Sequence, residues 1–225
     1  MRERIATACT RTGRDPGAVR LVAVSKTVPP RTLRAAVAAG LTELGENRVQ
    51  EAVAKAPLVP GATWHLVGHL QSNKARAALG LFAVIESVDS LELAQRLDRL
   101  LAEESAPGGG APRRLPVLLQ VNVDADAAKA GFMPRDLEVA LPALAALPRL
   151  RLDGLMTIGR LGEAPEEARS TFAALRRLSE GLRAGEGRLG AELSMGMSDD
   201  YRVAVEEGAT IVRIGRALFG ERPAT

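Results

Sequence analysis

Cysteine, histidine and aromatic residues are scarce in this 225-residue chain, which has one cysteine, two histidines and 3% aromatic residues. The single Cys9 excludes an internal disulfide and favours a reducing compartment, so we expect a cytoplasmic protein. His65 and His69 are four residues apart, but Gly68 and the strand-like sequence around them disfavour a helical pair of metal ligands. We therefore expect no metal site. The shortage of aromatic rings also disfavours surfaces on which single-stranded nucleic acid would stack.

The chain also lacks long apolar runs. None approaches the length that a membrane-spanning helix needs, and residues 1–4 carry mixed charge and lead into no long apolar region. We therefore expect neither a membrane protein nor a secretory signal. The formal net charge of +3 and the pI near 9.5 are compatible with nucleic-acid binding, but no run of five or more basic residues occurs. We expect no nucleic-acid partner.

Lysine is rare as well, because only four of the 30 basic residues are lysines. One of them, Lys26, comes at the end of an apolar segment that we expect to form a strand over 21–27. An apolar surrounding destabilises an ammonium group, which favours the neutral, nucleophilic amine that a Schiff base needs. The alternative interpretation is an ordinary lysine whose charged end reaches water.

Short apolar segments alternate with helical segments along the whole chain. We expect eight strands, at 21–27, 41–45, 64–68, 81–88, 116–123, 152–158, 192–194 and 209–214. Each is followed by a helical segment, and an additional helix precedes them over 1–12. This count predicts an α/β protein, a single-domain (β/α)8 TIM barrel over 1–225. A doubly wound open sheet is the alternative, but no Gly-x-Gly-x-x-Gly follows the first strand. We expect the glycine-rich segment 105–112 to be a loop on the face opposite the functional site.

In such a barrel the functional residues gather at the carboxyl ends of the strands. Lys26 is expected to end the first strand. The segments after the seventh and eighth strands are rich in small residues, which predicts a phosphate site. Ser194 and Ser198 would donate hydroxyl groups there, and Gly215 would allow the backbone to approach closely. Ser198 is also expected to cap the helix over 199–207.

Arg213 is the charged residue of the eighth strand. It alternates with Val212 and Ile214, so if those two face the outer helices, Arg213 points into the mouth of the barrel. A buried arginine needs a partner. An aromatic ring nitrogen or a phosphate oxygen would serve.

Several motifs stand in the order and spacing of one known family. They are Val24-Ser25-Lys26, Gly45-Glu46-Asn47, Trp64-His65, Leu155-Met156, the segment from Ser194 to Asp200, and Val212-Arg213-Ile214-Gly215. On these motifs the chain resembles the pyridoxal phosphate homeostasis proteins, also called the YggS or PROSC family. That family in turn resembles the N-terminal barrel of alanine racemase, of fold type III among proteins that use pyridoxal 5′-phosphate (PLP).

The resemblance implies a PLP cofactor and a role for each of several residues. Lys26 would form the Schiff base, and Arg213 would face the pyridine nitrogen. Asn47 and Met156 would flank the ring. The residues that the resemblance places around the phosphate are Ser194, Ser198, Gly215 and, through its backbone amide, Arg216. Many members of the family have threonine or serine where this chain has Arg216, so the hydroxyl of that side chain is missing here.

The resemblance implies an intracellular carrier or buffer of PLP that has no evident catalysis and serves PLP-dependent apoenzymes. The alternative is an amino-acid racemase. An arginine at the ring nitrogen leaves that nitrogen unprotonated, which makes the ring a poor electron sink and favours the carrier. A racemase also needs an acid or base on each face of the substrate carbon. The chain ends soon after the eighth strand, its only tyrosine is Tyr201, and we expect no covering domain. We expect a monomer, with a dimer as the alternative.

Overall fold

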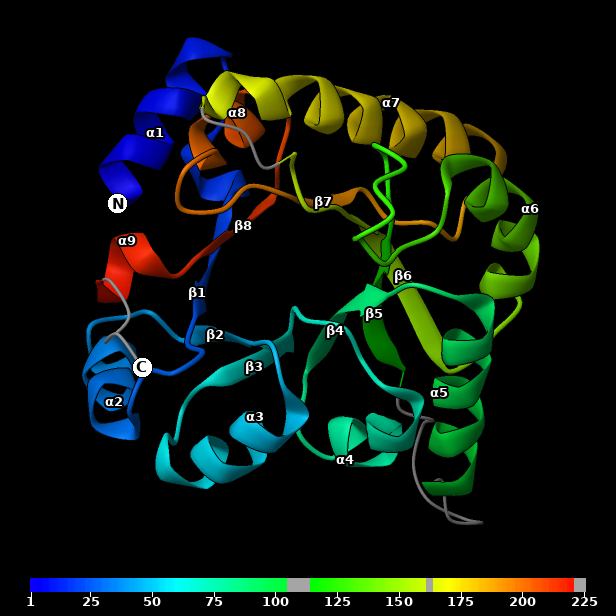
Figure 1. The fold of residues 1–225 in the computed structure, drawn as a ribbon, viewed down its shortest axis with the longest axis horizontal. Coiled ribbons are helices and arrows are strands. Elements are labelled where there is room, and N and C mark those ends of the chain that lie inside the picture. Colours follow the sequence, from blue (N-terminus) through cyan, green and yellow to red (C-terminus); the bar gives the residue numbers. More distant parts are fainter. Residues whose placement is uncertain (105–113, 161–163, 221–225) are drawn as a thin grey trace.

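A computed structural model of the protein describes residues 1–104, 114–160 and 164–220. In this part of the chain eight parallel strands close into a barrel (Figure 1), each paired with its neighbours in sequence and the last with the first. The expected barrel is therefore confirmed. The loop predicted at 105–112 lies outside the described residues. The strands are β1 (Arg20–Val24), β2 (Glu43–Glu46), β3 (Thr63–Leu66), β4 (Val84–Val88), β5 (Leu115–Gln120), β6 (Leu150–Met156), β7 (Glu192–Ser194) and β8 (Ile211–Ile214).

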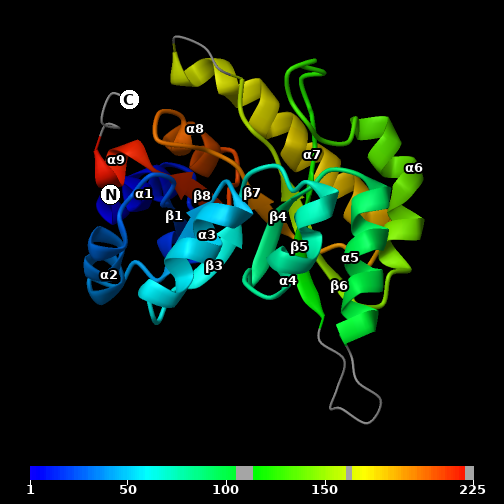
Figure 2. The ribbon, with the colours of Figure 1, turned by 60° about the horizontal axis from the view of Figure 1, so that its bottom comes forward.

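Helices surround the barrel, as Figures 1 and 2 show for α5 and α6 outside β5 and β6. Local signals account for several ends: Pro30 lies in the first turn of α2, and the Ser90 hydroxyl accepts a hydrogen bond from the Leu93 amide at the start of α5. The described helices are α1 (Arg2–Arg11), α2 (Pro30–Ala38), α3 (Val49–Lys55), α4 (Ala75–Leu79), α5 (Leu91–Glu104), α6 (Pro134–Ala145), α7 (Arg169–Gly185), α8 (Tyr201–Glu206) and α9 (Arg216–Phe219). None of them is long and apolar enough to cross a membrane.

The apolar core has two parts. The larger part lies between strands and helices and includes Val212 and Ile214. The smaller part fills the inside of the barrel with Val22, Val67, Leu118, Met156 and Ile211. Since successive side chains of a strand point to opposite faces, Arg213 faces the inside of the barrel, as its alternation with Val212 and Ile214 predicts.

The expected first strand is too long. β1 ends at Val24, and Lys26 lies in the turn that follows it. The Val28 amide donates to the Ser25 carbonyl at 3.0 Å, and Thr27 adopts a left-handed φ of 65°. These two features turn the chain away from the barrel before the two prolines at 29 and 30. Lys26 therefore sits beyond the strand end, at the carboxyl-terminal rim of the barrel.

The expected cap of the helix after the seventh strand is also wrong. α8 begins at Tyr201, with Asp200 at the N-cap position, so Ser198 lies two residues before the cap. The Asp200 carboxylate accepts a hydrogen bond of 2.6 Å from the Met197 amide, which folds residues 197–200 into a turn ahead of the helix. This turn leaves the Ser198 hydroxyl available to a different partner.

The extra helix α1 packs against α8, beside which it lies in Figure 1. Its inner side buries Ile5, Ala8 and Cys9. Beyond α1, the Arg14 guanidinium donates hydrogen bonds to the carbonyl groups of Val205, at 2.6 Å, and Ala209, at 2.8 Å. These contacts fasten the start of the chain to the segment between α8 and β8.

Candidate functional site

Lys26 and the segment after β8 share a cavity of about 250 Å³ at the carboxyl-terminal rim. Lys26 is half-buried there. Gly215 and Arg216 line the same cavity from the other side, because β1 pairs with β8 and the register of Ala23 with Ile214 places the two strand ends together. The structure therefore brings Lys26 next to the predicted phosphate segment.

The segments after β7 and β8 are joined to each other. The Ser198 hydroxyl accepts a hydrogen bond from the Ala217 amide at 3.4 Å, and the Arg216 guanidinium pairs with Asp199. Ser198 and the backbone of residues 215–217 thus lie side by side, and their role around a phosphate stays a prediction. The Arg216 side chain, for which the sequence predicts no role, ties α9 to the loop after β7.

Ser194 is oriented differently from the expectation that it faces a phosphate. It is fully buried, and its hydroxyl donates to Glu86 Oε2 at 2.5 Å while it accepts from Arg213 Nη1 at 2.7 Å. The other amino group of Arg213 donates to the Thr157 carbonyl at 2.8 Å. A hydroxyl has one hydrogen, and that of Ser194 is donated to Glu86 inside the barrel and not toward a phosphate.

Glu86 is the centre of this buried polar network. His65 Nδ1 lies 2.7 Å from Glu86 Oε1, and both side chains are buried. Burial raises the pKa of the Glu86 carboxyl, but the hydrogen bonds from His65 and Ser194, with the charges of His65 and Arg213, outweigh burial and hold this pKa below its usual range. Burial lowers the pKa of Arg213, and the charge of Glu86 opposes that effect. The arrangement is that of a buried ion pair bridged by Ser194.

Asn47 and Met156 are not in the cavity that Lys26 lines. Asn47 lines a neighbouring cavity of about 720 Å³ with Arg48 and Lys74. Its backbone lies against Gly68, where a Cβ atom would come within 2.4 Å of the Asn47 carbonyl oxygen. Met156 is fully buried in the apolar interior of the barrel. The flanking roles expected for these two residues stay predictions.

No role for Glu86 or Lys55 was predicted from the sequence, although Lys55 bonds to the Lys26 turn. The signal for Glu86 was available, since it is a charged residue between Ile85 and Ser87 in an apolar strand, the same pattern that singles out Lys26 and Arg213. No comparable signal marks Lys55, which lies on an ordinary helix and whose contact with Ser25 spans 30 residues of sequence.

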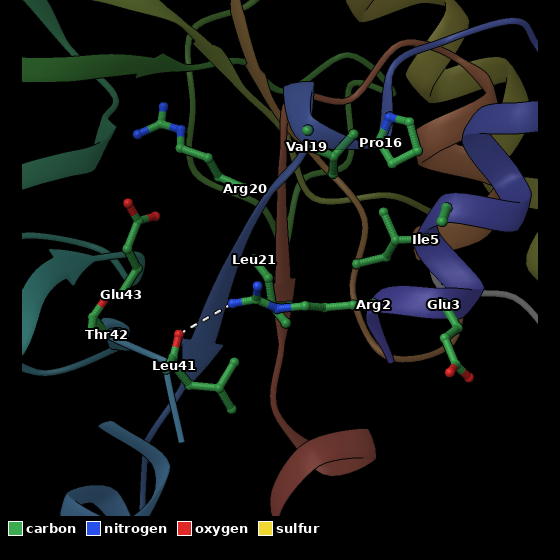
Figure 3. A pocket seen from close by; sticks show the side chains of 13 residues that line it. Arg2, Glu3, Ile5, Pro16, Val19, Arg20, Leu21, Leu41, Thr42 and Glu43 are labelled. Carbon is green, nitrogen blue, oxygen red and sulfur yellow. Dashed lines mark hydrogen bonds between the residues drawn. The ribbon is translucent and has the colours of Figure 1, made fainter. Parts of the chain in front are cut away.

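A further cavity, of about 580 Å³, opens at the opposite end of the barrel (Figure 3). It lies between α1, which contributes Arg2 and Ile5, and the amino ends of β1 and β2, with Arg20 and Glu43. None of the predicted site residues lines it. Since the residues that β/α barrels use for function gather at the carboxyl ends of the strands, we assign the candidate site to the Lys26 end. In the described part of the chain no group of three or more His, Cys, Asp or Glu side chains could hold a metal ion.

The chain is similar to proteins of one family over nearly its whole length. The family model for the alanine racemase N-terminal domain matches residues 1–223. The pyridoxal phosphate homeostasis protein of Pseudomonas aeruginosa is 46% identical over 221 residues, covering 97% of this chain and 91% of the relative. The protein of that name from Escherichia coli strain K12 is 39% identical over 231 residues, covering 99% of this chain and 94% of the relative.

Solved structures agree with this similarity. PipY from Synechococcus elongatus, in its structure with PLP bound, matches with a TM-score of 0.84 and 45% identity, covering 97% of this chain and 99% of PipY. Its structure without PLP matches with a TM-score of 0.85. An alanine racemase from Clostridium difficile matches with a TM-score of 0.68 at 15% identity, covering 99% of this chain and 60% of the racemase, and this likeness concerns the fold alone.

Proposed function

Because the chain belongs to the family of pyridoxal phosphate homeostasis proteins, we propose that it binds PLP through Lys26 and serves as a carrier or buffer of the cofactor. The observation that carries the proposal is the cavity that Lys26 shares with Gly215 and Arg216. An amine on one side of a small cavity and a glycine-containing backbone segment on the other suit a molecule that has an aldehyde and a phosphate. The PLP-bound structure of the similar PipY supports the same choice of ligand.

Each residue has a role in this proposal. Lys26 binds the aldehyde covalently as a Schiff base. Ser198 and the backbone amides of Gly215 and Arg216 hold the phosphate. Arg213 faces the pyridine nitrogen from inside the barrel, and Asn47 and Met156 flank the ring. The hydroxyl of Ser194 accepts from Arg213 and donates to Glu86, and we propose that this bridge, rather than a bond to the phosphate, is its main contribution.

The buried pair of Arg213 and Glu86 supports a carrier over a racemase. When bound, PLP supplies an aldehyde and an electron-accepting ring, whose acceptor strength depends on a protonated ring nitrogen. Burial lowers the pKa of Arg213 and the charge of Glu86 opposes this effect, and a guanidinium offers only N–H donors to that nitrogen. The ring nitrogen would then remain unprotonated, which disfavours carbanion chemistry.

The position of Tyr201 gives further support for a carrier. It is the only tyrosine of the chain, and it is 3% exposed, in α8 beneath the loop after β7. Its hydroxyl lies 3.5 Å from the Arg202 Nε donor. A buried phenol cannot exchange protons with a substrate at the rim of the barrel, so Tyr201 does not provide the second acid or base that a racemase needs. We further propose PLP-dependent apoenzymes as recipients, a cytoplasmic location and a monomeric state.

Cofactor retention tests the proposal. The cofactor-free protein is incubated with PLP and desalted, and we expect an absorbance band in the visible range that Lys26→Ala abolishes. Borohydride reduction followed by peptide mass spectrometry should place the cofactor on Lys26. The matched control is Lys74→Ala, a lysine that lines the neighbouring cavity, and this variant should retain the band. A colourless wild-type protein, or a band that survives in Lys26→Ala, would contradict the proposal.

Incubation of the loaded protein with L- and D-amino acids separates a carrier from an enzyme. We expect the loaded protein to racemise or transaminate the amino acids no faster than free PLP does. Chiral chromatography of the amino acids measures these rates. Turnover that depends on Lys26 would make the racemase alternative correct.

A further inference from the structure

Lys55 is bonded more extensively than a surface lysine on a short helix needs to be. Its side chain is 12% exposed. Its Nζ donates to the Ser25 carbonyl at 2.8 Å, to Glu46 Oε1 at 2.7 Å and to Glu51 Oε2 at 3.4 Å. Three acceptors around one nitrogen suit a compact ammonium group with three hydrogens. A planar guanidinium presents its donors in a fork and would not match this arrangement, which explains a lysine here in a chain whose basic residues are mostly arginines.

All three acceptors belong to the turn that carries Lys26 or are bonded to that turn. Ser25 precedes Lys26, and its hydroxyl donates to Glu46 Oε1 at 2.7 Å, the same oxygen that Lys55 contacts. On the other side of Lys26, the Thr27 amide donates to Glu51 Oε2 at 3.3 Å. The residues before and after Lys26 are therefore both attached to one group of charged side chains, made of Glu46, Glu51 and Lys55.

The turn needs such support because its backbone is strained. Thr27 has a φ of 65°, a left-handed conformation that residues with a branched Cβ rarely adopt. A strained residue keeps its conformation only when the surrounding bonds fix it. The Val28-to-Ser25 hydrogen bond closes the turn from within, and the three charged side chains hold it from outside.

Burial of Glu46 also stabilises its ion pair with Lys55. Glu46 is fully buried, and a buried carboxylate without a counter-charge is strongly unfavourable. Lys55 supplies that counter-charge at 2.7 Å, so loss of this contact would leave the Glu46 carboxylate buried without one. The same nitrogen donates to the Ser25 carbonyl, so the ion pair also keeps that hydrogen bond in place.

We propose that Lys55, together with Glu46 and Glu51, is a positioning residue that fixes the turn at 25–28 and so directs the Lys26 amine into the cavity shared with Gly215. Lys55 does not touch the cofactor in this scheme and acts through the backbone on either side of Lys26. The consequence for cofactor attachment rests on the function proposed above. The fixing of the turn does not depend on that function and can be tested by itself.

Amide hydrogen exchange of the cofactor-free protein tests the fixing of the turn. Lys55→Arg keeps the positive charge beside Glu46 but changes the geometry of the donors, so we expect the amides of Thr27 and Val28 to exchange about tenfold faster or more. The matched control is Lys74→Arg, in which these amides should exchange as in the wild type. Exchange at the wild-type rate in Lys55→Arg would overturn the proposal.

Glu51→Ala provides a second variant in case Lys55→Arg does not fold. Glu51 is half-buried, and this change removes the acceptor of the Thr27 amide while it leaves the Lys55–Glu46 pair intact. We expect faster exchange of the Thr27 amide, again by about tenfold or more. An unchanged rate would overturn the proposal independently of Lys55.

The rate of cofactor attachment tests the effect on Lys26. We expect Lys55→Arg to unfold at nearly the wild-type temperature and yet to attach PLP about tenfold more slowly, because a freely moving turn holds the amine in the reactive direction less of the time. Wild-type attachment kinetics in this variant would overturn the proposal. If the wild-type protein itself attaches no PLP, the function proposed above fails, and the exchange experiments still decide whether Lys55 fixes the turn.

Discussion

At the scale of single residues, the carboxylate of Glu86 compensates the charge of Arg213 and helps to fix its orientation. Both side chains are buried inside the barrel, at 0% and 4% exposure, where a single uncompensated charge is strongly unfavourable. Ser194 connects them through two hydrogen bonds, and His65 completes the coordination of the carboxylate. Arg213 is therefore held in one orientation before any ligand binds.

Glu86→Gln tests the strength of this pair. The change keeps the shape of the side chain but leaves Arg213 buried without its counter-charge, so we expect the free energy of unfolding at pH 7 to fall by about 3–5 kcal/mol. Chemical denaturation measures this change. The control is Glu138→Gln on the exposed side of α6, for which we expect a change of less than about 0.5 kcal/mol. Equal effects of the two substitutions would show that Glu86 does not compensate Arg213.

The difference in stability between the wild type and Glu86→Gln should depend on pH. The pKa of Glu86 is lowered by folding, so its contribution to stability is fully present above its ordinary value of 4.5 and is lost as the pH falls through the lower, folded-state pKa. The difference in unfolding free energy between wild type and Glu86→Gln should therefore stay constant near neutrality and shrink below about pH 4.5. A difference that grows on acidification would contradict this assignment.

At the scale of elements, the loop after β7 reaches its position through one glycine. Gly196 has a φ of 92°, and a Cβ atom there would lie 2.5 Å from the Cβ of Ala204 in α8. Its carbonyl accepts a hydrogen bond of 2.9 Å from the Arg213 amide, which joins the loop to β8. The close packing of this loop on α8 places Ser198 next to Ala217.

Gly196→Ala should disturb both the stability and the site. We expect a loss of about 1–3 kcal/mol in the free energy of unfolding, from backbone strain and from the contact with Ala204. We also expect weaker retention of PLP, because the loop that carries Ser198 must move away from α8. The control is Gly181→Ala in the exposed part of α7, where an added Cβ would meet no neighbouring atom within 4 Å. Alanine favours the helix more than glycine does, so stability should rise slightly. A tolerated alanine at 196 would refute the packing argument.

At the scale of the whole molecule, the helix α1 covers part of the barrel and hides the single cysteine. Cys9 is fully buried between α1 and its neighbours, and burial raises the pKa of its thiol, against the opposing charge of Arg14. Since the thiolate is the reactive form, a buried thiol with a raised pKa reacts slowly. Cys9 can therefore report on the detachment of α1 from the barrel.

We expect Cys9 in the folded protein to react with a thiol reagent at pH 7 about 100-fold more slowly than in denaturant. Arg14→Met removes the two hydrogen bonds to Val205 and Ala209 and should accelerate the reaction by loosening the start of the chain. The control is Arg4→Met, which changes an exposed arginine on α1. Fast labelling of the native wild type would mean that α1 is not stably docked.

Much of the fold and part of the site followed from local patterns. Short apolar runs between turn residues predicted eight strands and a barrel, and alternation within 212–214 predicted that Arg213 faces inward. These predictions work because the period of a strand and the punctuation by glycine and proline are properties of adjacent residues. The exact ends of strands were less predictable. Lys26 was expected on β1, but a hydrogen bond within the turn and the left-handed Thr27 end the strand at Val24.

The sequence by itself determined which residue types stand at the carboxyl ends of the strands, above all Lys26, Ser198 and Gly215, because these are fixed by position along the chain. Only the tertiary structure decided which of them meet. Closure of the barrel brings Glu86 to Ser194, 108 residues away, and α3 brings Lys55 to the turn of Lys26. The physical reason is that buried charges and hydroxyl groups take their partners from whichever strand or helix the closed barrel places beside them, and no local period encodes that choice.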